Sequence, residues 1–517
     1  MQIVLLIAIV LFALGGIFST TRQLQMLQQN SYFPSRYFKW LKGAFSYKVV
    51  FSAIFLGVAI LLCLLSLYIP LLIFGLLTAV IKINNAKSGQ KKSIKPLVFT
   101  ARVKRLYVTS IIIFAALAIV GFLVFKPILL LVLVFCYCPP ITVLLARTIN
   151  APMENALGAM YIADAKRKLK SHANLKVIGI TGSYGKTSTK YILASFLEQK
   201  YNVLYTPASF NTPFGIVRTV REGLRPDTQV FIAEMGAKNV GDIKEICAIA
   251  NPSECIITSV GPQHLDTFKS VENVTKTKFE LADWVKKNGG GIFLNTDNEY
   301  INAKASEYNH HAFGKVGDTR YENVCYTENG AEFDIISGDK TLHIKTKLLG
   351  SHNVVNITAA AGLALSLGVS ERDIIFAAAK LKPVEHRLEM KTFINGSILL
   401  DDAYNANPVG CIEAVNVLGA FEGRKKVIVT PGLIELGEKE YECNYNLGKA
   451  AAEICDTIIL VGKQRAIPMK KAAEDANFSG NLMVVSSFAE AMDYLRNNTK
   501  NDWVVLFEND LPDNYTK

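Results

Sequence analysis

One segment of the chain combines glycines, a lysine and hydroxyl residues at a spacing that suits phosphate binding. The segment 182–190 reads GSYGKTSTK, follows a run typical of a buried strand (175–181), and precedes a helical stretch that ends near Gln199. Strand, glycine loop and helix is the order that a phosphate-binding loop requires. Two residues separate its glycines, whereas the usual loop has about four. We assign these residues to a nucleotide: Gly182, Ser183, Gly185, Lys186, Thr187 and Ser188.

Several side chains in and beyond this loop could carry out phosphoryl chemistry. Lys186 would reach the β- and γ-phosphates, and the Thr187 hydroxyl would bind a magnesium ion. Magnesium prefers oxygen ligands, so Glu234, at the end of a predicted strand, is a second candidate ligand. His264 and Lys278 are further candidates, although an isolated loop histidine or helical lysine more often has no such role. Together these residues predict transfer of the terminal phosphoryl group of ATP.

Nine segments, taken in chain order, resemble the motifs of the Mur ligases, which build the peptide of the bacterial cell wall. The last is most similar to the branch of the family that adds D-alanyl-D-alanine. The resemblance extends from about Leu175 to the carboxyl end. The segments are GSYGKTSTK (182–190), SFNTPFG (209–215), VFIAEMGA (230–237), IITSVGPQHLD (256–266), VTKTKFE (274–280), LNTD (294–297), GSHNVVN (350–356), HRLE (386–389) and DDAYNANP (401–408).

The resemblance implies a role for particular residues. Thr187 and Glu234 would bind magnesium, while His264 and a carbamylated Lys278 would hold a second ion near the acceptor carboxylate. The implied catalytic residues are Lys186, His264, Lys278 and Asp402. The implied nucleotide contacts outside the loop are Asn295, Asn353, Asn356, Arg387 and Asp401. Asn353 and Asn356 could instead cap a helix, and Arg387 could instead lie at a hinge between domains. The implied substrate contacts are Asn211, Tyr404, Asn405 and Asn407.

Formation of an amide bond explains why ATP and Mg²⁺ are needed. A carboxylate in water does not react with an amine until it is activated. Transfer of the γ-phosphate gives an acyl phosphate, which the amine can attack. The charge on the moving phosphoryl group must be neutralised, which is a suitable task for Lys186 and a bound magnesium ion.

The first 150 residues predict a membrane domain. Apolar runs cover residues 2–18, 49–81 and 107–145, with Pro70 inside the second and Lys126–Pro127 inside the third. A membrane-spanning helix needs about 20 apolar residues. We therefore predict five helices, of which the second and third runs each form a hairpin. The first run has no preceding basic residue, which favours an uncleaved helix over a signal peptide.

Charge predicts the orientation of this domain. No Asp or Glu precedes Glu154, and 15 Lys and Arg residues do, so this part of the chain has a charge of +15. The whole chain has a net charge of +12, which leaves −3 for the part that begins at Glu154. Basic loops stay in the cytoplasm, so we expect a multi-pass protein of the bacterial cytoplasmic membrane with its catalytic domains inside the cell. The positive charge indicates contact with the lipid bilayer rather than with nucleic acid.

The rest of the chain predicts two α/β domains. Residues 151–174 are a polar, helix-prone linker, residues 175–384 a P-loop domain, and residues 385–517 a Rossmann-like, doubly wound domain with apolar strands separated by helical stretches. The nine cysteines are scattered, which is typical of reduced thiols. Ligands of the last domain should bind at the carboxyl ends of its strands, where Asp401 and Asp402 lie.

Two departures from the Mur ligases bear on the substrate. Residues 151–174 leave no room for the domain that holds the UDP-sugar in the family, and the ending FENDLPDNY (507–515) differs from the lysine–glycine–serine ending common in the D-alanyl-D-alanine branch. The acceptor could therefore be a UDP-linked or a lipid-linked muramoyl peptide, and the added amine an amino acid or a dipeptide. Two alternatives are a membrane-anchored ligase of the capsular polyglutamate type and a degenerate ligase that acts as a scaffold. A transporter finds little support, because the predicted membrane helices contain almost no ionisable residues.

Overall fold

The computed structural model describes the chain except for residues 1, 31, 44–46, 92–95, 125, 209, 264, 328, 384–385, 404–407, 435, 463–465 and 510–517. Four of the predicted site residues, His264, Tyr404, Asn405 and Asn407, thus lie outside the described residues. The chain forms two compact units, Met1–Tyr161 and Ile162–Lys517. Each unit has its own sets of buried apolar side chains.

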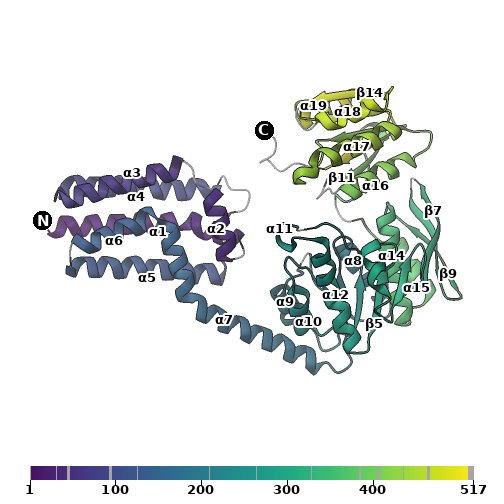
Figure 1. The fold of residues 1–517 in the computed structure, drawn as a ribbon, viewed down its shortest axis with the longest axis horizontal. Coiled ribbons are helices and arrows are strands. Elements are labelled where there is room, and N and C mark those ends of the chain that lie inside the picture. Colours follow the sequence, from purple (N-terminus) through teal and green to yellow (C-terminus); the bar gives the residue numbers. More distant parts are fainter. Residues whose placement is uncertain are drawn as a thin grey trace. The chain divides into compact units, whose positions relative to one another are not determined.

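The N-terminal unit is entirely helical in its described part, with α1 packed against both α4 and α5 (Figure 1). The second apolar run breaks into α3 and α4 at residues 65–67, ahead of the predicted turn near Pro70. Proline is tolerated in the first turn of a helix, and Pro70 lies in the first turn of α4. The helices are α1 Gln2–Gln29, α2 Pro34–Gly43, α3 Tyr47–Leu64, α4 Tyr68–Lys91, α5 Ala101–Val124, α6 Lys126–Tyr137 and α7 Pro139–Ser171.

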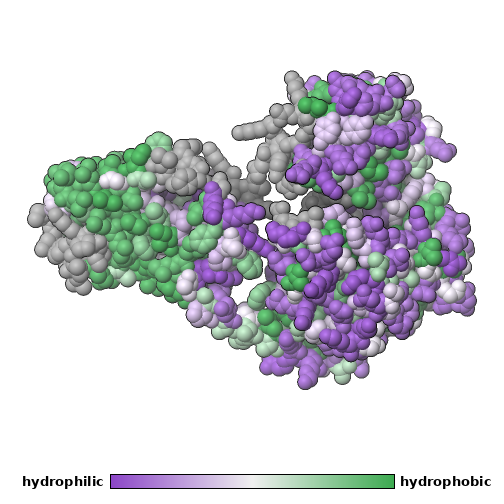
Figure 2. All heavy atoms as spheres, viewed as in Figure 1, coloured by the Kyte–Doolittle hydropathy of each residue, from purple (hydrophilic) through white to green (hydrophobic). Residues whose placement is uncertain are grey.

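Helices therefore form at the five predicted membrane positions, but not all are long enough to cross a bilayer. In the described part of the chain three helices are long and apolar enough, namely α1, α4 and α5. A fourth span results if α6 and α7, which meet at a bend of 94°, count as one. Large apolar side chains cover the outer surface of this unit (Figure 2). Apolar surface of this extent is typical of a protein that contacts a membrane.

The predicted linker is helical and continues α7 without a break. Residues 162–171 of α7 belong to the second unit, where the Asp164 carboxylate pairs with Arg221 at 2.9 Å and Lys168 Nζ donates to the Arg221 carbonyl at 3.0 Å. The boundary between the two compact units falls within α7, at Tyr161.

The central domain is a nine-stranded sheet in the order β2-β3-β1-β4-β5-β6-β7-β8-β9. Strands from β2 to β7 pair in parallel, and β8 and β9 extend the sheet as antiparallel strands. The helices α8, α14 and α15 share one apolar core with the sheet. The strands are β1 Lys176–Thr181, β2 Val203–Tyr205, β3 Val230–Glu234, β4 Glu254–Ile257, β5 Gly291–Asn295, β6 His311–Gly314, β7 Thr319–Thr327, β8 Gly330–Ser337 and β9 Lys340–Thr346. The helices are α8 Lys186–Leu197, α9 Pro213–Gly223, α10 Asp242–Ala250, α11 Leu265–Phe268, α12 Val271–Lys287, α13 Glu299–Ala305, α14 Ser351–Ser366 and α15 Glu371–Ala379.

The C-terminal domain is a six-stranded sheet in the order β10-β11-β15-β12-β13-β14, parallel except for β10. Helices α16, α17 and α18 pack on one face and α19 on the other, so the predicted doubly wound fold is confirmed. The strands are β10 Glu389–Thr392, β11 Ile398–Asp402, β12 Lys425–Thr430, β13 Thr457–Val461, β14 Asn481–Val485 and β15 Trp503–Glu508. The helices are α16 Pro408–Gly419, α17 Glu440–Ile454, α18 Ala466–Asp475 and α19 Phe488–Asn498.

Candidate active site

The phosphate-binding loop lies where three neighbouring parallel strands end. Strand β1 runs between β3 and β4, so its carboxyl end brings the loop together with Glu234 and with the segment 258–261. The Lys186 ammonium folds back over the loop and donates to the Gly182 carbonyl at 2.7 Å and the Ser183 carbonyl at 3.0 Å. Burial lowers the pKa of Lys186 to about 8. These contacts hold the lysine beside the backbone N–H groups that would receive phosphate.

The segment after β4 fixes the shape of this loop. Ser183 N–H donates to the Ser259 carbonyl at 2.7 Å, and Tyr184 N–H donates to Ser259 Oγ at 2.9 Å. The Thr258 hydroxyl donates to the Tyr184 carbonyl. The loop is therefore shaped by the protein before any ligand arrives.

Glu234 is the centre of a buried polar cluster beside the loop. Its Oε1 accepts hydrogen bonds from the Thr187 hydroxyl and the Asn211 amide, both at 3.1 Å. Its Oε2 pairs with Lys190 Nζ at 3.0 Å, and the side chains of this ion pair are 0% and 1% exposed. The cluster places a hydroxyl and a carboxylate oxygen side by side, which is the ligand chemistry that Mg²⁺ prefers.

Helix α14 approaches the loop through an asparagine. Asn356 Oδ1 accepts a hydrogen bond from the Thr189 hydroxyl at 3.0 Å, while the buried Nδ2 has no partner. Gly185 has a φ of +81°, and a Cβ atom at this position would lie 2.7 Å from Asn356 Oδ1. Glycine is therefore required here both for its backbone conformation and for the close approach of α14.

Two other predicted nucleotide contacts bond to the protein's own backbone. Asn295 Nδ2 donates to the Thr258 carbonyl at 2.7 Å, and its Oδ1 accepts from Asp297 N–H at 3.1 Å. Asn353 Nδ2 donates to the Leu349 carbonyl at 2.8 Å within the first turns of α14. Both asparagines therefore have a structural role in this conformation.

Lys278 is buried in the middle of α12, with 2% of its surface exposed. Burial lowers its pKa to about 7, and the nearby Lys186 cation contributes to the shift. A substantial fraction of Lys278 is thus neutral at physiological pH, unlike an ordinary surface lysine. Its predicted partner His264 lies outside the described residues.

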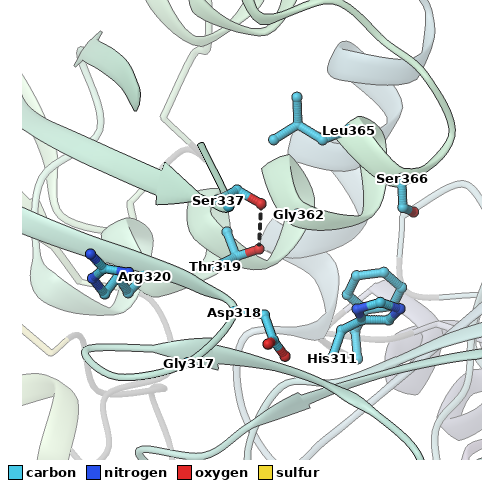
Figure 3. A pocket seen from close by; sticks show the side chains of 11 residues that line it. His311, Gly317, Asp318, Thr319, Arg320, Ser337, Gly362, Leu365 and Ser366 are labelled. Atoms are coloured by element: carbon cyan, nitrogen blue, oxygen red, sulfur yellow. Dashed lines mark hydrogen bonds between the residues drawn. The ribbon is translucent and has the colours of Figure 1, made fainter. Parts of the chain in front are cut away.

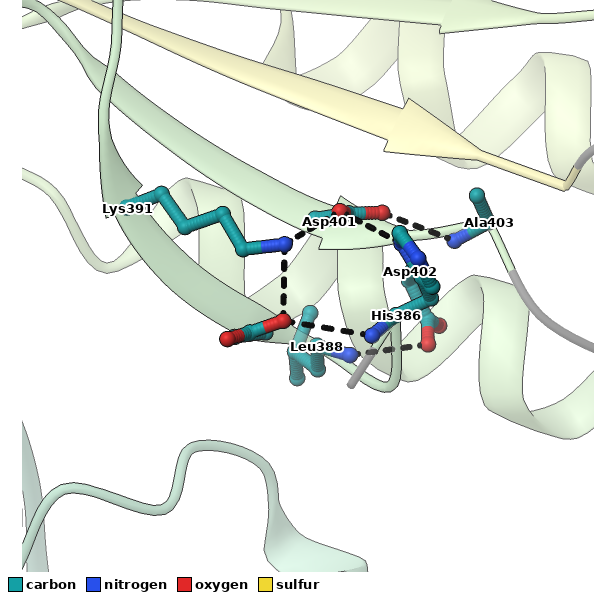
Figure 4. A network of polar contacts seen from close by, with 7 residues as sticks. His386, Leu388, Lys391, Asp401, Asp402 and Ala403 are labelled. Atoms are coloured by element: carbon teal, nitrogen blue, oxygen red, sulfur yellow. Dashed lines mark hydrogen bonds and ion pairs between the residues drawn. The ribbon is translucent and has the colours of Figure 1, made fainter. Parts of the chain in front are cut away.

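The C-terminal domain presents two adjacent carboxylates in different surroundings (Figure 4). Asp401 accepts hydrogen bonds from His386 Nδ1 and Lys391 Nζ, both at 2.8 Å. Burial alone would raise the pKa of Asp401, but these two hydrogen bonds lower it overall. Among the described residues the Leu388 N–H donates to Asp402 at 2.9 Å, and burial raises the pKa of Asp402 to about 6 although the nearby Arg387 cation lowers it. The half-buried Arg387 lies between His386 and Leu388 in the turn before β10.

A separate pocket of about 410 Å³ lies elsewhere in the central domain (Figure 3). Phe293, His311, Thr319 and Ser337 are among its lining residues, and none of the predicted site residues line it. Among the described residues no group of three or more His, Cys, Asp or Glu side chains is arranged to hold a metal ion. The candidate magnesium site at the loop pairs Glu234 with Thr187, and threonine is not one of those four residue types.

The sequence did not identify Lys190, Thr258 and Ser259 as site residues. Lys190 lies one helical turn after Lys186, a spacing that places both residues on the same side of α8. Thr258 and Ser259 directly follow β4, where ligand-binding residues are expected in parallel sheets. The helical spacing of Lys190 and the strand-end position of Thr258 and Ser259 could therefore have identified these three residues from the sequence.

The chain matches the model of the Mur ligase middle domain over residues 180–364 and that of the Mur ligase glutamate ligase domain over residues 386–507. It is 30% identical to the UDP-N-acetylmuramoyl-tripeptide–D-alanyl-D-alanine ligase of Bacillus subtilis (strain 168), covering 64% of this chain and 72% of the relative. The enzyme of the same name from Escherichia coli (strain K12) is 29% identical, covering 62% and 73%.

Solved structures agree with these sequence matches. The structure of MurF ligase from Thermotoga maritima in complex with ADP is similar, with a TM-score of 0.60, 27% identity, and coverage of 68% of this chain and 80% of that one. A structure of MurF from Acinetobacter baumannii also has a TM-score of 0.60 and 27% identity, covering 68% and 77%. With its loop, its buried glutamate and its two α/β domains, the chain belongs to the Mur ligase family of ATP-dependent enzymes that form C–N bonds.

Proposed function

We propose that this chain adds D-alanyl-D-alanine, or a similar amine, to the terminal carboxylate of a muramoyl peptide during cell-wall synthesis. The observation that carries this proposal is the arrangement of Lys186 and Thr187 beside Glu234 in a loop that is already shaped for phosphate. The relatives named for this reaction supply the substrate class.

The reaction proceeds in two steps. The acceptor carboxylate attacks the γ-phosphorus of ATP, the bond to the β-phosphate oxygen breaks, and an acyl phosphate and ADP result. The amine then loses a proton and attacks the acyl carbon, and inorganic phosphate leaves. Lys186 neutralises charge on the phosphates, and the loop N–H groups orient them.

Thr187 and Glu234 fit a magnesium ion, since the hydroxyl and the carboxylate Oε1 lie 3.1 Å apart. A bound magnesium ion would supply positive charge to the phosphates. Lys190 holds the other carboxylate oxygen of Glu234, and Asn211 also donates to Oε1, so the ligand is oriented from two sides. This support suggests that Asn211 acts through Glu234 and not only on substrate.

Lys278 is suited to carbamylation. Carbon dioxide reacts with a neutral amine, and the lowered pKa of Lys278 keeps a neutral fraction at physiological pH. The resulting carbamate, with His264, would hold a second ion near the acceptor carboxylate. That position would counter the negative charge of the acceptor as it attacks the γ-phosphate.

We further propose that the protein is a multi-pass protein of the bacterial cytoplasmic membrane with its ligase domains in the cytoplasm. Three described helices are long and apolar enough to cross a membrane, and both basic loops lie on the cytoplasmic side if α3 and α4 cross as a hairpin. A membrane location suits an acceptor that is itself linked to a lipid. If a UDP-linked acceptor served equally well after removal of residues 1–150, presentation at the membrane would be excluded.

The experiment measures phosphate release by the purified full-length chain in detergent, with ATP, Mg²⁺, D-alanyl-D-alanine and either a UDP-linked or a lipid-linked muramoyl tripeptide. We expect release that requires both substrates and disappears in Lys186→Ala. Lys345→Ala, which removes a lysine 72% exposed on β9, is the matched control and should retain activity. Release with glutamate in place of the dipeptide would favour a polyglutamate-type ligase, and no release with any amine would favour a scaffold.

A further inference from the structure

Helix α2 has an aromatic face that packs against the end of α1. The Tyr37 side chain is fully buried, and its hydroxyl donates to Gln23 Oε1 of α1 at 2.6 Å. The Tyr37 and Trp40 rings lie 5.6 Å apart, and they pack in a core that includes Leu24 and Leu27 of α1. This face therefore fixes α2 to the end of α1.

The opposite face of α2 is basic and partly aromatic. At about 3.6 residues per turn, Lys39 and Lys42 lie roughly 140–160° around the helix from Tyr37, and both are exposed. Phe38 precedes Lys42 by four residues, so the two side chains are neighbours on the helix surface, and Phe38 is 46% exposed. We call Phe38, Lys39 and Lys42 the outer face of α2.

The N-terminal unit has a single carboxylate side chain to offer these lysines. Glu154 is the only Asp or Glu in the sequence of this unit. Its two oxygens pair with Arg105 at 2.6 Å and with Arg102 at 3.5 Å. In the described part of the chain neither Lys39 nor Lys42 takes part in an ion pair. An anion that neutralises the outer face of α2 must therefore come from outside this unit.

The contact between α2 and α1 lies just beyond the apolar part of α1. The first apolar run ends at Phe18, and Gln23 follows five residues later, which is about 7.5 Å along a helix axis. Arg22, the first basic residue of the chain, directly precedes Gln23. The headgroup layer on each side of a bilayer is about 5–7 Å thick. If α1 spans the membrane, the hydrogen bond to Gln23 holds α2 at the level of the headgroups.

We propose that the outer face of α2 binds anionic phospholipid headgroups of the cytoplasmic leaflet. The inference rests on the proposed membrane location. Lys39 and Lys42 contact the lipid phosphates, and Phe38 enters the boundary between headgroups and acyl chains, as is typical of a basic amphipathic helix at a membrane surface. A soluble anion would leave Phe38 in water, whereas a lipid covers both the charges and the ring.

The test measures which lipid lies beside α2 in the full-length chain, reconstituted in nanodiscs of equal parts phosphatidylglycerol and phosphatidylcholine. Bromine on the acyl chains near the headgroup quenches tryptophan fluorescence, and it is placed on the anionic lipid in one preparation and on the zwitterionic lipid in the other. Trp40 lies in α2, whereas Trp284 and Trp503 lie in the catalytic domains. The Trp40→Phe variant gives the signal of those two residues, which is subtracted.

We expect brominated phosphatidylglycerol to quench Trp40 at least about twofold more than brominated phosphatidylcholine does. One lysine near an anionic surface contributes a preference of roughly fivefold, which lipids that contact only Trp40 dilute. Lys39→Gln with Lys42→Gln should bring the two signals within about 1.3-fold of each other. Raising the salt from about 0.05 M to 0.5 M should weaken the preference of wild type in the same way, without any substitution.

The matched control is Lys345→Gln with Lys470→Gln, which removes the same charge from exposed positions of the second unit and should keep the preference. Equal quenching by both lipids in wild type would overturn the proposal, because headgroup charge would then not matter. Absence of quenching by either lipid would also overturn it, because α2 would then lie away from the membrane. A wild-type chain that stays in solution without detergent and does not enter nanodiscs would overturn the proposed membrane location, and this inference with it.

Discussion

The buried ion pair between Lys190 and Glu234 allows a quantitative test of how the candidate magnesium site is held. The two charged atoms lie 3.0 Å apart, and both side chains are essentially excluded from solvent. Removing one partner of such a pair leaves an uncompensated buried charge, which costs about 3–5 kcal/mol. Glu234→Gln keeps an oxygen for Thr187 and Asn211 but removes the charge that Lys190 faces. We therefore expect this variant to be destabilised by about that amount.

The assay is thermal unfolding of the full-length chain in detergent, followed by tryptophan fluorescence, to which Trp284 in α12 of the same domain contributes. For a domain of about this size each kcal/mol corresponds to roughly 2–4 °C, so a decrease of roughly 6–20 °C is expected. The matched control is Glu332→Gln, because Glu332 pairs with Lys345 at 2.9 Å on the exposed surface. Exposed pairs contribute little, so the control should unfold almost as wild type does.

A double-mutant cycle separates the pair from its surroundings. Lys190→Met alone leaves Glu234 buried with two hydrogen-bond donors, and Lys190→Met with Glu234→Gln removes both charges. The double variant should be destabilised by at least about 1 kcal/mol less than the sum of the single variants, because coupled residues depart from additivity. Additive losses within about 0.5 kcal/mol would refute the reasoning and would mean that Glu234 does not depend on Lys190 for its charge balance.

Three further predictions concern the loop and the buried lysine. Gly185→Ala should reduce ATP affinity and melting temperature together, since its Cβ would contact Asn356 Oδ1 at 2.7 Å; unchanged nucleotide binding would contradict the required close approach. Asn356→Leu should change stability by less than about 1 kcal/mol, because it also removes an unpartnered buried donor, yet raise the KM for ATP; an unchanged KM would give Asn356 a purely structural role. Lys278→Met should abolish ligation. In carbon dioxide-free buffer Lys278→Met should also raise the melting temperature more at pH 6 than at pH 9. The cost of burying the charged lysine is fully present below its folded pKa of about 7 and disappears as the pH approaches its unfolded pKa of 10.5. An equal increase at both pH values would refute the lowered pKa.

Local patterns in the sequence were sufficient for much of the fold. The apolar strands predicted for residues 385–517 are present as β11 to β15, and the glycine loop lies between β1 and α8 as predicted. These elements have periodic apolar residues or glycines that report on their own conformation. Strand β10 and the antiparallel strands β8 and β9 were not predicted. Strands β9 and β10 lie at sheet edges, and β8 and β9 bury only alternate residues, unlike the continuously buried parallel strands.

Features that depend on distant contacts were less predictable. Lys190 became part of the site because Glu234, 44 residues away, neutralises it. Asn295 and Asn353 have the residue type of ligand contacts, but their amides already bond to nearby carbonyls. The polar second half of α7 looked like a separate linker, because the apolar run ends while helix propensity continues. In each case the sequence specifies the residue type, whereas the partner follows from the tertiary structure.

The distribution of compensated and uncompensated charge connects the two halves of the proposed reaction. In the central domain Glu234 has Lys190 as a buried partner, and in the described part of the chain the Lys186 ammonium donates to two backbone carbonyls. In the C-terminal domain burial raises the pKa of Asp402 to about 6, and the nearby Arg387 cation opposes this rise. An amide ligase of this type must receive an anionic phosphate and a cationic amine. The Lys186 ammonium lies at the loop that would bind the phosphate, so the central domain carries the positive charge that its anionic substrate requires.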